Sequence, residues 1–211
     1  MALGRAILRR ASHVWGWLEV VPRVPIYREN HRRVRWLTSA EVKRLLEQLP
    51  EHQREIALFG LATGLRKSNI LGMEWSQVSL SRKQAWIHPD QAKARKAIAV
   101  PLNDVAVGVI QRQIGRHDTF VFTYNGKRLK QVNTKAWQKA LQRAEINDFR
   151  WHDLRHCWAS WHAQAGTPAH VLQELGGWSC AEMAKRYAHL GVDHLSQYAD
   201  NVFEGHNFDT L

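Results

Sequence analysis

Two short strand patterns interrupt a chain whose apolar residues otherwise recur at helical spacing. They are Gln84-Ala85-Trp86-Ile87-His88 and Ala97-Ile98-Ala99-Val100, and Pro101 closes the second. With a turn around residues 92–96, the two patterns predict a small antiparallel sheet. The predicted fold class is therefore α+β, mainly α-helical with a small antiparallel β-sheet. Helices are expected at 55–62, 103–115, 131–145, 152–165, 168–175, 180–189 and 193–203.

Two prolines and a basic run separate a first segment from the rest of the chain. Residues 6–19 carry an apolar stripe that predicts one amphipathic helix, which ends before Pro22 and Pro25. After a basic linker, Thr38 and Glu41 form a capping-box pattern that opens a helix through Leu49. We expect residues 1–36 to be a helix with a basic linker, and residues 37–211 to be a separate domain.

The composition narrows the possible partners. Thirty Lys and Arg against 19 Asp and Glu give a formal net charge of +11. A domain this basic usually meets a polyanion, so nucleic acid is the first candidate, and a merely soluble basic protein is the alternative. Two cysteines are too few for a disulfide framework and lack the spacing of a zinc ribbon. No stretch has the length of a signal peptide or membrane span, so we expect a cytoplasmic protein without membrane contact.

The stretch from His152 to Trp161 has two distinct faces when it is wound as a helix. The apolar side chains share one face, and His152, Arg155 and His156 share the other. Taken alone, an ordinary amphipathic helix with a solvated basic face explains this pattern. A zinc site on the two histidines is disfavoured, because no glutamate follows His152 and no third ligand is evident nearby.

Arg66 follows a glycine that can stop a helix. We expect Gly64 to adopt a left-handed conformation after the helix at 55–62, which leaves Arg66 at the start of the next helix, beside free backbone amides. The forked donors of an arginine can bind two phosphate oxygens at once, and this geometry suits a pentacovalent phosphoryl transition state. A surface arginine after a turn is the alternative.

Tyr187 and Lys93 are ordinary residues when each is taken alone. Tyr187 lies in the middle of an expected helix, nine positions after Trp178 in Leu175-Gly176-Gly177-Trp178. A tyrosine there is usually a packing residue with a solvated hydroxyl. Lys93 lies on the expected hairpin turn, where Lys96 competes for any role and an exposed turn lysine is the alternative.

Taken together, these motifs resemble the catalytic domain of the tyrosine recombinases, the phage integrase family. Thr63-Gly64-Leu65-Arg66, the lysine turn, His152-Asp153-Leu154-Arg155-His156, and the stretch from Leu175 to Leu190 occur in the order of that family. The resemblance covers roughly residues 37 to 203. It implies the recombinase catalytic-domain fold, with residues 1–36 as a remnant of a core-binding domain and residues 193–203 as a C-terminal tail helix.

The resemblance implies a mechanism in which the Tyr187 hydroxyl attacks a DNA phosphodiester and forms a covalent 3′-phosphotyrosine. No metal or nucleotide cofactor is needed. Lys93 would protonate the leaving 5′-oxygen, and His152 would take the proton of Tyr187. The implied catalytic residues are Arg66, Lys93, His152, Arg155, Trp178 and Tyr187, with Trp178 contacting the phosphate through its indole N–H and with Asn69 and His156 in support. The implied DNA-binding residues are Arg32, Arg33, Arg35, Lys67, Arg95 and Lys96.

Implied partners are double-stranded DNA attachment sites, a homotetramer on DNA that is a monomer when free, and accessory DNA-bending proteins. The tail helix would dock on its own chain or on a neighbour. One departure from the family pattern is Asn69, because many members carry an acidic residue three positions after the arginine, so we expect altered support of Arg66. Three alternatives remain at this point: a DNA-binding fragment without cleavage activity, a type IB topoisomerase that relaxes DNA, and a zinc enzyme.

Overall fold

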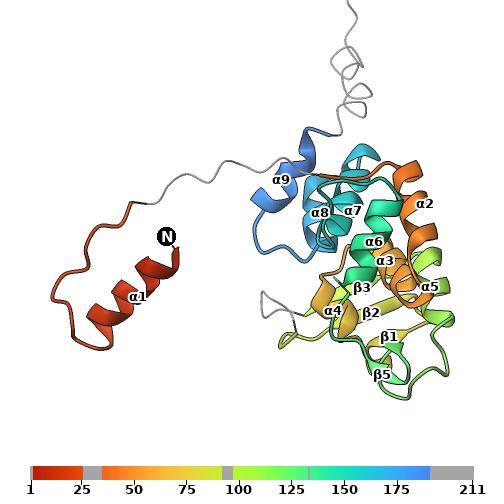
Figure 1. Ribbon diagram of the computed structural model, residues 1–211, viewed down its shortest axis with the longest axis horizontal. Helices are drawn as coiled ribbons and strands as arrows, with labels where there is room; N and C mark the ends of the chain where they lie inside the picture. The colour runs from red at the N-terminus through yellow and green to blue at the C-terminus, as the bar shows by residue number, and fades with distance from the viewer. Residues whose placement is uncertain (1, 26–34, 92–96, 133, 191–211) are drawn as a thin grey trace, which may run out of the picture. The chain divides into compact units, whose positions relative to one another are not determined.

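A computed structural model describes residues 2–25, 35–91, 97–132 and 134–190. The chain divides into two compact units, Met1–Arg33 and Val34–Leu211 (Figure 1). Each unit is described by itself. Within the described ranges, no helix has the length and apolar content needed to cross a bilayer.

The described residues of the first unit contain one helix, α1 (Ala2–His13). The prediction that this helix extends to residue 19 is wrong at its C-terminal end. Gly16 has a φ of 65°, and the Trp17 N–H donates to the Ala11 carbonyl at 2.9 Å. A left-handed glycine with such a returning hydrogen bond is a common helix stop. Val14 and Trp15, two apolar residues within the predicted helix at 6–19, therefore lie beyond α1 and are exposed.

Short helices build most of the second unit. The capping box predicted for the first of these is confirmed: the Thr38 hydroxyl accepts from the Glu41 N–H, and the Glu41 carboxylate accepts from the Thr38 N–H. The predicted helices between residues 39 and 189 are found, most of them shorter than expected. They are α2 (Ser39–Gln48), α3 (Glu51–Thr63), α4 (Lys67–Leu71), α5 (Asp104–Gln111), α6 (Lys135–Arg143), α7 (Asp153–Gln164), α8 (Ala169–Leu175) and α9 (Glu182–Ala188), with a 3₁₀ turn at Trp75–Gln77.

The predicted antiparallel hairpin is confirmed, and it gains a third strand. Strand β2 (Gln84–Ile87) pairs with β3 (Ile98–Pro101) in the register Ala85 opposite Val100, and β1 (Val78–Ser79) adds to the other edge of β2. A second hairpin, β4 (Thr123–Tyr124) with β5 (Lys127–Arg128), was not predicted. Its turn is Asn125-Gly126, and both residues have positive φ. This dipeptide is a strong hairpin signal that the sequence does contain.

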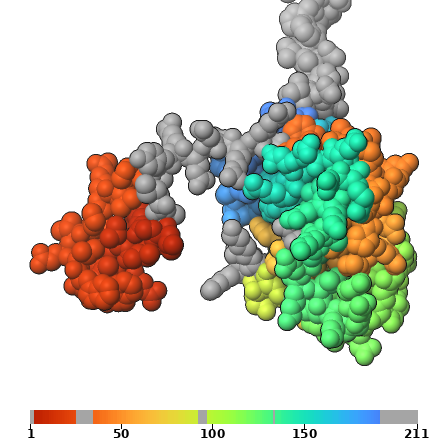
Figure 2. Space-filling view, in the orientation of Figure 1, coloured from red at the N-terminus to blue at the C-terminus, as the bar shows by residue number. Residues whose placement is uncertain are grey.

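Two hydrophobic clusters stabilise the second unit, and α7 contributes to both. The larger cluster joins α2, α3, α5, α6 and the three-stranded sheet, and α7 adds Leu154 and Cys157 to it. The smaller cluster lies among α7, α8 and α9 and is formed by Trp158, Ala159, Ala163, Leu172, Trp178, Ala184 and Tyr187. Helices α8 and α9 lie together at one end of the unit, with β5 at the other end (Figure 1). In the space-filling view, α2 in orange borders the teal α6 (Figure 2).

Candidate active site

Arg155 projects from α7 into the interior, with only 6% of its surface exposed. Its Nη1 donates to the Gly64 carbonyl and its Nη2 to the Gly176 carbonyl, both at 2.5 Å. The two carbonyls belong to the turns that follow α3 and α8. The alternative of a solvated basic face therefore does not hold for Arg155, because backbone carbonyls replace water around its guanidinium. Among the described residues no carboxylate pairs with it.

The turn that carries Arg66 is fixed by a glycine against a tryptophan. Gly64 has a φ of 63°, as the left-handed helix stop predicted. A Cβ at this position would lie 2.3 Å from the ring of Trp158, so no larger residue fits without a shift. Arg66 is the N-cap residue of α4 and is half-buried. Trp158 belongs to α7, so its ring limits how closely the turn that carries Arg66 can approach that helix.

The two arginines lie close enough to influence each other. Burial first, and then the like charge of Arg66, lowers the pKa of Arg155 to about 10, while the nearby Tyr187 acts in the opposite direction. Burial also lowers the pKa of Arg66. Both guanidiniums remain cations at neutral pH. Two partly desolvated cations without a carboxylate partner form a site that favours a phosphate group.

Tyr187 lies in the smaller cluster with 2% of its surface exposed. Its hydroxyl is 2.5 Å from Nδ1 of His156, and its ring stacks on Trp178 with 5.8 Å between the centroids and 14° between the planes. Burial raises the pKa of Tyr187 to about 12. The phenol is therefore protonated at neutral pH, and a nucleophilic attack by its oxygen requires a base.

His156 is the imidazole in direct contact with this phenol, whereas we expected His152 to accept its proton. Burial, followed by the charge of His152, lowers the pKa of His156, which favours the neutral ring that a base requires. His152 is exposed at the N-cap position of α7, and its ring meets His156 edge-on at 5.4 Å. The two histidines are thus adjacent, and His156 is the one hydrogen-bonded to the Tyr187 hydroxyl.

Trp178 joins the arginine to the tyrosine. The guanidinium carbon of Arg155 lies 4.8 Å from the centre of the Trp178 ring, and the Tyr187 ring stacks on the same indole. The next glycine in the turn, Gly177, has a φ of 57°, and a Cβ there would lie 2.6 Å from Cδ1 of Ile98 on β3. The turn after α8 therefore contacts α7, the tyrosine cluster and the sheet.

Not every predicted site residue can be placed at this site. Lys93, Arg95 and Lys96, like Arg32, Arg33 and the predicted tail helix, lie outside the described residues. Lys67 is exposed at the start of α4. Arg35 pairs with Glu41 at 3.3 Å and donates to the Trp36 carbonyl.

Asn69, the neutral residue near Arg66, is 3% exposed. The Ser68 hydroxyl lies 3.4 Å from its Oδ1, and its Nδ2 has no partner among the described residues. The described residues contain no group of three or more His, Cys, Asp or Glu side chains that could hold a metal ion.

Sequence reasoning missed three groups that build this site. Trp158 was assigned to packing alone, and the roles of the Gly64 and Gly176 carbonyls were not foreseen. The extra glycine in Leu175-Gly176-Gly177-Trp178 was visible as a departure from the single glycine of the family pattern. It signals a turn in which the backbone approaches other groups closely. No sequence signal indicates that a carbonyl in that turn accepts from Arg155.

Comparison with known proteins agrees with this geometry. The model of the phage integrase family matches residues 35–194. The integrase of Salmonella phage P22 is 45% identical over 215 aligned positions, which cover 94% of this chain and 56% of that protein. A shufflon-specific DNA recombinase of Escherichia coli is 30% identical, and the aligned region covers 95% of this chain and 52% of that protein. The chain thus spans about half the length of these relatives.

Solved structures show the same fold. The catalytic domain of bacteriophage HP1 integrase superposes with a TM-score of 0.61 at 26% identity, covering 80% of this chain and 95% of that one. The Tn1549 transposon integrase in complex with transposon right end DNA gives a TM-score of 0.68 at 19% identity, covering 83% of this chain and 68% of that one. The latter likeness is one of fold alone.

Proposed function

Because the chain belongs to the phage integrase family, we propose that it is a site-specific DNA recombinase that breaks and rejoins strands through Tyr187. One observation carries the proposal: the Tyr187 hydroxyl is hydrogen-bonded to His156 near the Arg155 guanidinium, for which the described residues provide no carboxylate partner. The proposed substrate is a DNA phosphodiester in an attachment site. Residues 37–211 would form the catalytic domain, and residues 1–36 would be the end of a core-binding domain.

In the proposed reaction the arginines hold the phosphate. Each of the two Nη atoms of Arg155 donates one N–H to a backbone carbonyl. Three of the five guanidinium N–H groups therefore remain to bind phosphate oxygens. Because backbone carbonyls fix its plane before DNA arrives, little reorganisation is needed when negative charge builds up on the phosphorane. Arg66 would bind the same phosphate from the neighbouring turn, and Trp178 would contact that phosphate through its indole N–H.

The chemical step exchanges one phosphoester for another. The Tyr187 oxygen bonds to phosphorus, its proton passes to an imidazole, and the bond from phosphorus to the 5′-oxygen breaks. We propose His156 as the first acceptor of the proton, with His152 as its neighbour, and Lys93 as the acid that protonates the 5′-oxygen. Religation runs the same steps in reverse toward a new 5′-hydroxyl, and the phosphodiester energy is conserved in the covalent intermediate.

The burial of Tyr187 adds one requirement. A nucleophile must come within about 3–3.5 Å of the atom it attacks. Because Tyr187 is buried, its hydroxyl cannot reach a DNA phosphate unless α9 shifts. The α9 helix has seven residues and packs in the smaller cluster. We propose that this shift accompanies binding of DNA and assembly of a tetramer on two sites, with accessory DNA-bending proteins and docking of residues 193–203.

Covalent trapping tests the proposal. The chain is incubated with nicked duplex DNA that carries candidate attachment sequence, and the products are separated on a denaturing gel. A slow protein–DNA band is expected, and Tyr187→Phe should abolish it. Tyr124→Phe is the matched control, because Tyr124 is exposed and its ring lies tilted beside that of His52, with 4.1 Å between the centroids. A native gel shift without any covalent band would instead favour the DNA-binding fragment, and relaxation of plasmid without a site requirement would favour a topoisomerase.

A further inference from the structure

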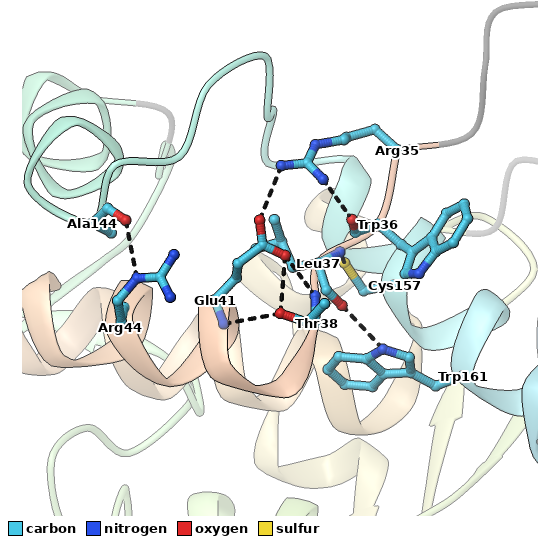
Figure 3. Close-up of polar contacts among 9 residues, drawn as sticks. All are labelled: Arg35, Trp36, Leu37, Thr38, Glu41, Arg44, Ala144, Cys157 and Trp161. Atoms are coloured by element: carbon cyan, nitrogen blue, oxygen red, sulfur yellow. Dashed lines mark hydrogen bonds and ion pairs between the residues drawn. The ribbon is translucent and has the colours of Figure 1, made fainter.

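Both polar groups of the Leu37 backbone are hydrogen-bonded to side chains of α7. The Leu37 N–H donates to Sγ of Cys157 at 3.2 Å, and Nε1 of Trp161 donates to the Leu37 carbonyl at 3.2 Å (Figure 3). Leu37 and Cys157 are both fully buried. We call these two bonds the Leu37 contact. They join residues that are 120 and 124 positions apart in the chain.

The Leu37 contact fixes α7 at two successive turns. Cys157 and Trp161 are four positions apart, so they lie one above the other on the same helix face. Arg155 comes two positions before Cys157, which places its side chain about 200° around the axis. The helix that carries the catalytic arginine is therefore held on the opposite face by a segment from the start of the domain.

The segment that contains Leu37, which faces α7 across this contact, is itself held in place by hydrogen bonds and an ion pair. Next to Leu37, Arg35 pairs with Glu41, and the Glu41 carboxylate accepts from the Thr38 N–H at 2.7 Å (Figure 3). Hydrogen bonds from Thr38 and Arg35 and the positive charge of Arg35 lower the pKa of Glu41 against the effect of burial, with the Thr38 backbone bond first among these causes. Farther along α2, Arg44 donates to the Ala144 carbonyl at 3.3 Å. Leu37 thus lies in a segment that is tied to α2.

The Cys157 thiol acts here as an acceptor. Burial raises its pKa to about 12, so the group is a neutral thiol and not a reactive thiolate. A neutral thiol is a weak acceptor, and its position is set by the helix that carries it.

We propose that Cys157 and Trp161 are positioning residues for the strand-transfer reaction. Through the Leu37 contact they set the rotation of α7, and so the placement of Arg155 on its two carbonyls and of His156 on the Tyr187 hydroxyl. This inference rests on the proposed function.

The experiment compares substitutions that remove one hydrogen bond each. Trp161→Phe removes the indole donor, and Cys157→Ala removes the acceptor, whereas Cys157→Ser retains an acceptor for the Leu37 N–H. Trp75→Phe is the matched control, because Nε1 of Trp75 donates to the His117 carbonyl at 2.8 Å and Trp75 is likewise half-buried. The rate of covalent complex formation at saturating DNA, the DNA concentration at half saturation, and urea unfolding are measured for each.

We expect Trp161→Phe and Cys157→Ala to slow the reaction at saturating DNA by about tenfold or more, because displacements of about 1 Å can have effects of this size. Half saturation should change by less than about twofold, since binding energy would be retained when placement is lost. Cys157→Ser should restore most of the rate. Equal rates in Trp161→Phe and Trp75→Phe, at equal losses of stability, would overturn the proposal.

A measurement without DNA separates this inference from the proposed function. The titration of His156 by NMR, assigned with His156→Gln, reports how closely α7 places this ring beside Tyr187. Trp161→Phe should move its pKa toward the ordinary histidine value, and Trp75→Phe should not. If the unmodified chain forms no covalent complex, the proposed function fails and the titration alone decides: a shift specific to Trp161→Phe supports the Leu37 contact, and no shift rejects it.

Discussion

The arginine and tyrosine sides of the candidate site are held by different kinds of interaction. Arg155 is bound by two backbone carbonyls from turns that follow α3 and α8. Tyr187 is held by side chains, through one bond to His156 and a ring stack on Trp178. The helix of Arg155 also enters the larger hydrophobic cluster, whereas Tyr187 belongs only to the smaller one.

This difference separates a fixed part of the site from a releasable one. Backbone carbonyls in turns can move only if the turns themselves rearrange, so the position of the cation is set before any ligand binds. A side chain held by one hydrogen bond and one stacked ring can leave when a short helix shifts. We infer that the phosphate-binding half is preorganised and that the nucleophile joins it later.

The largest expected effect comes from breaking the fixed half. Arg155→Lys replaces a planar fork with a single ammonium that cannot span both carbonyls and still present donors. We expect the rate of covalent complex formation at saturating DNA to fall on the order of 10³-fold. Arg112→Lys, which alters a cation paired with Glu55, is the control and should retain the rate. Retention of more than about a tenth of the rate by Arg155→Lys would argue against a need for the fork.

A stability difference should follow from the turn after α3. Gly64→Ala combines a left-handed backbone with a clash against Trp158, and we expect the free energy of unfolding to fall by about 2–4 kcal/mol. Gly115→Ala is the matched control, since Gly115 has a φ of 78° and nothing within 4 Å, and it should lose about 1 kcal/mol. Urea unfolding measures both. Equal losses would show that the Trp158 contact can relax without cost.

A smaller change in folding stability should appear in alkaline solution, where Tyr187 titrates. Because the folded state raises the pKa of Tyr187 to about 12, it retains a proton that the unfolded chain releases near pH 10. The stability that this group contributes is present below about pH 10 and is lost as the pH rises toward about 12. Urea unfolding between about pH 9 and pH 11 should therefore show a steeper loss for the unmodified chain than for Tyr187→Phe. Parallel pH profiles would contradict the burial of this phenol.

The smallest expected effect is a loss of folding stability in acidic solution, where His156 titrates. The folded state lowers the pKa of His156, so the unfolded chain binds this proton more tightly. Stability is retained above the ordinary histidine value of about 6.5 and is lost as the pH falls toward the lowered value in the folded chain. His156→Gln should reduce this acid sensitivity in urea unfolding. His162→Gln provides a comparison, because burial also lowers the pKa of His162, which bonds to Thr167 rather than to Tyr187.

Local patterns in the sequence were sufficient to predict most of the fold. The capping box at Thr38, the helix stop at Gly64 and the pairing of β2 with β3 depend on neighbours along the chain or across one hairpin, and all three are found. The end of α1 was predicted wrongly because the apolar stripe continued past Gly16. A left-handed glycine ends a helix even where the side-chain pattern would extend it.

Contacts between distant segments could not be predicted in this way. Helical spacing put Arg155 on the polar face with His152, but its burial depends on two carbonyls that are 91 and 21 residues away. The choice of His156 as partner of Tyr187 depends on how α9 packs against α7, which no local pattern specifies. The site residues were therefore named from their types and order, whereas their partners required the folded chain.

The close approach of Gly177 to Ile98 has a consequence for how this chain can evolve. The turn that presents the Gly176 carbonyl to Arg155 rests directly on a strand of the sheet, so positions 98 and 177 share one space. A side chain at 177 would have to adopt a left-handed backbone and would also meet Ile98, so a shorter residue at 98 would relieve only the second of these costs. Across related chains, we expect glycine to be retained at 177 even where position 98 varies, although the two positions belong to different motifs and lie far apart in the sequence.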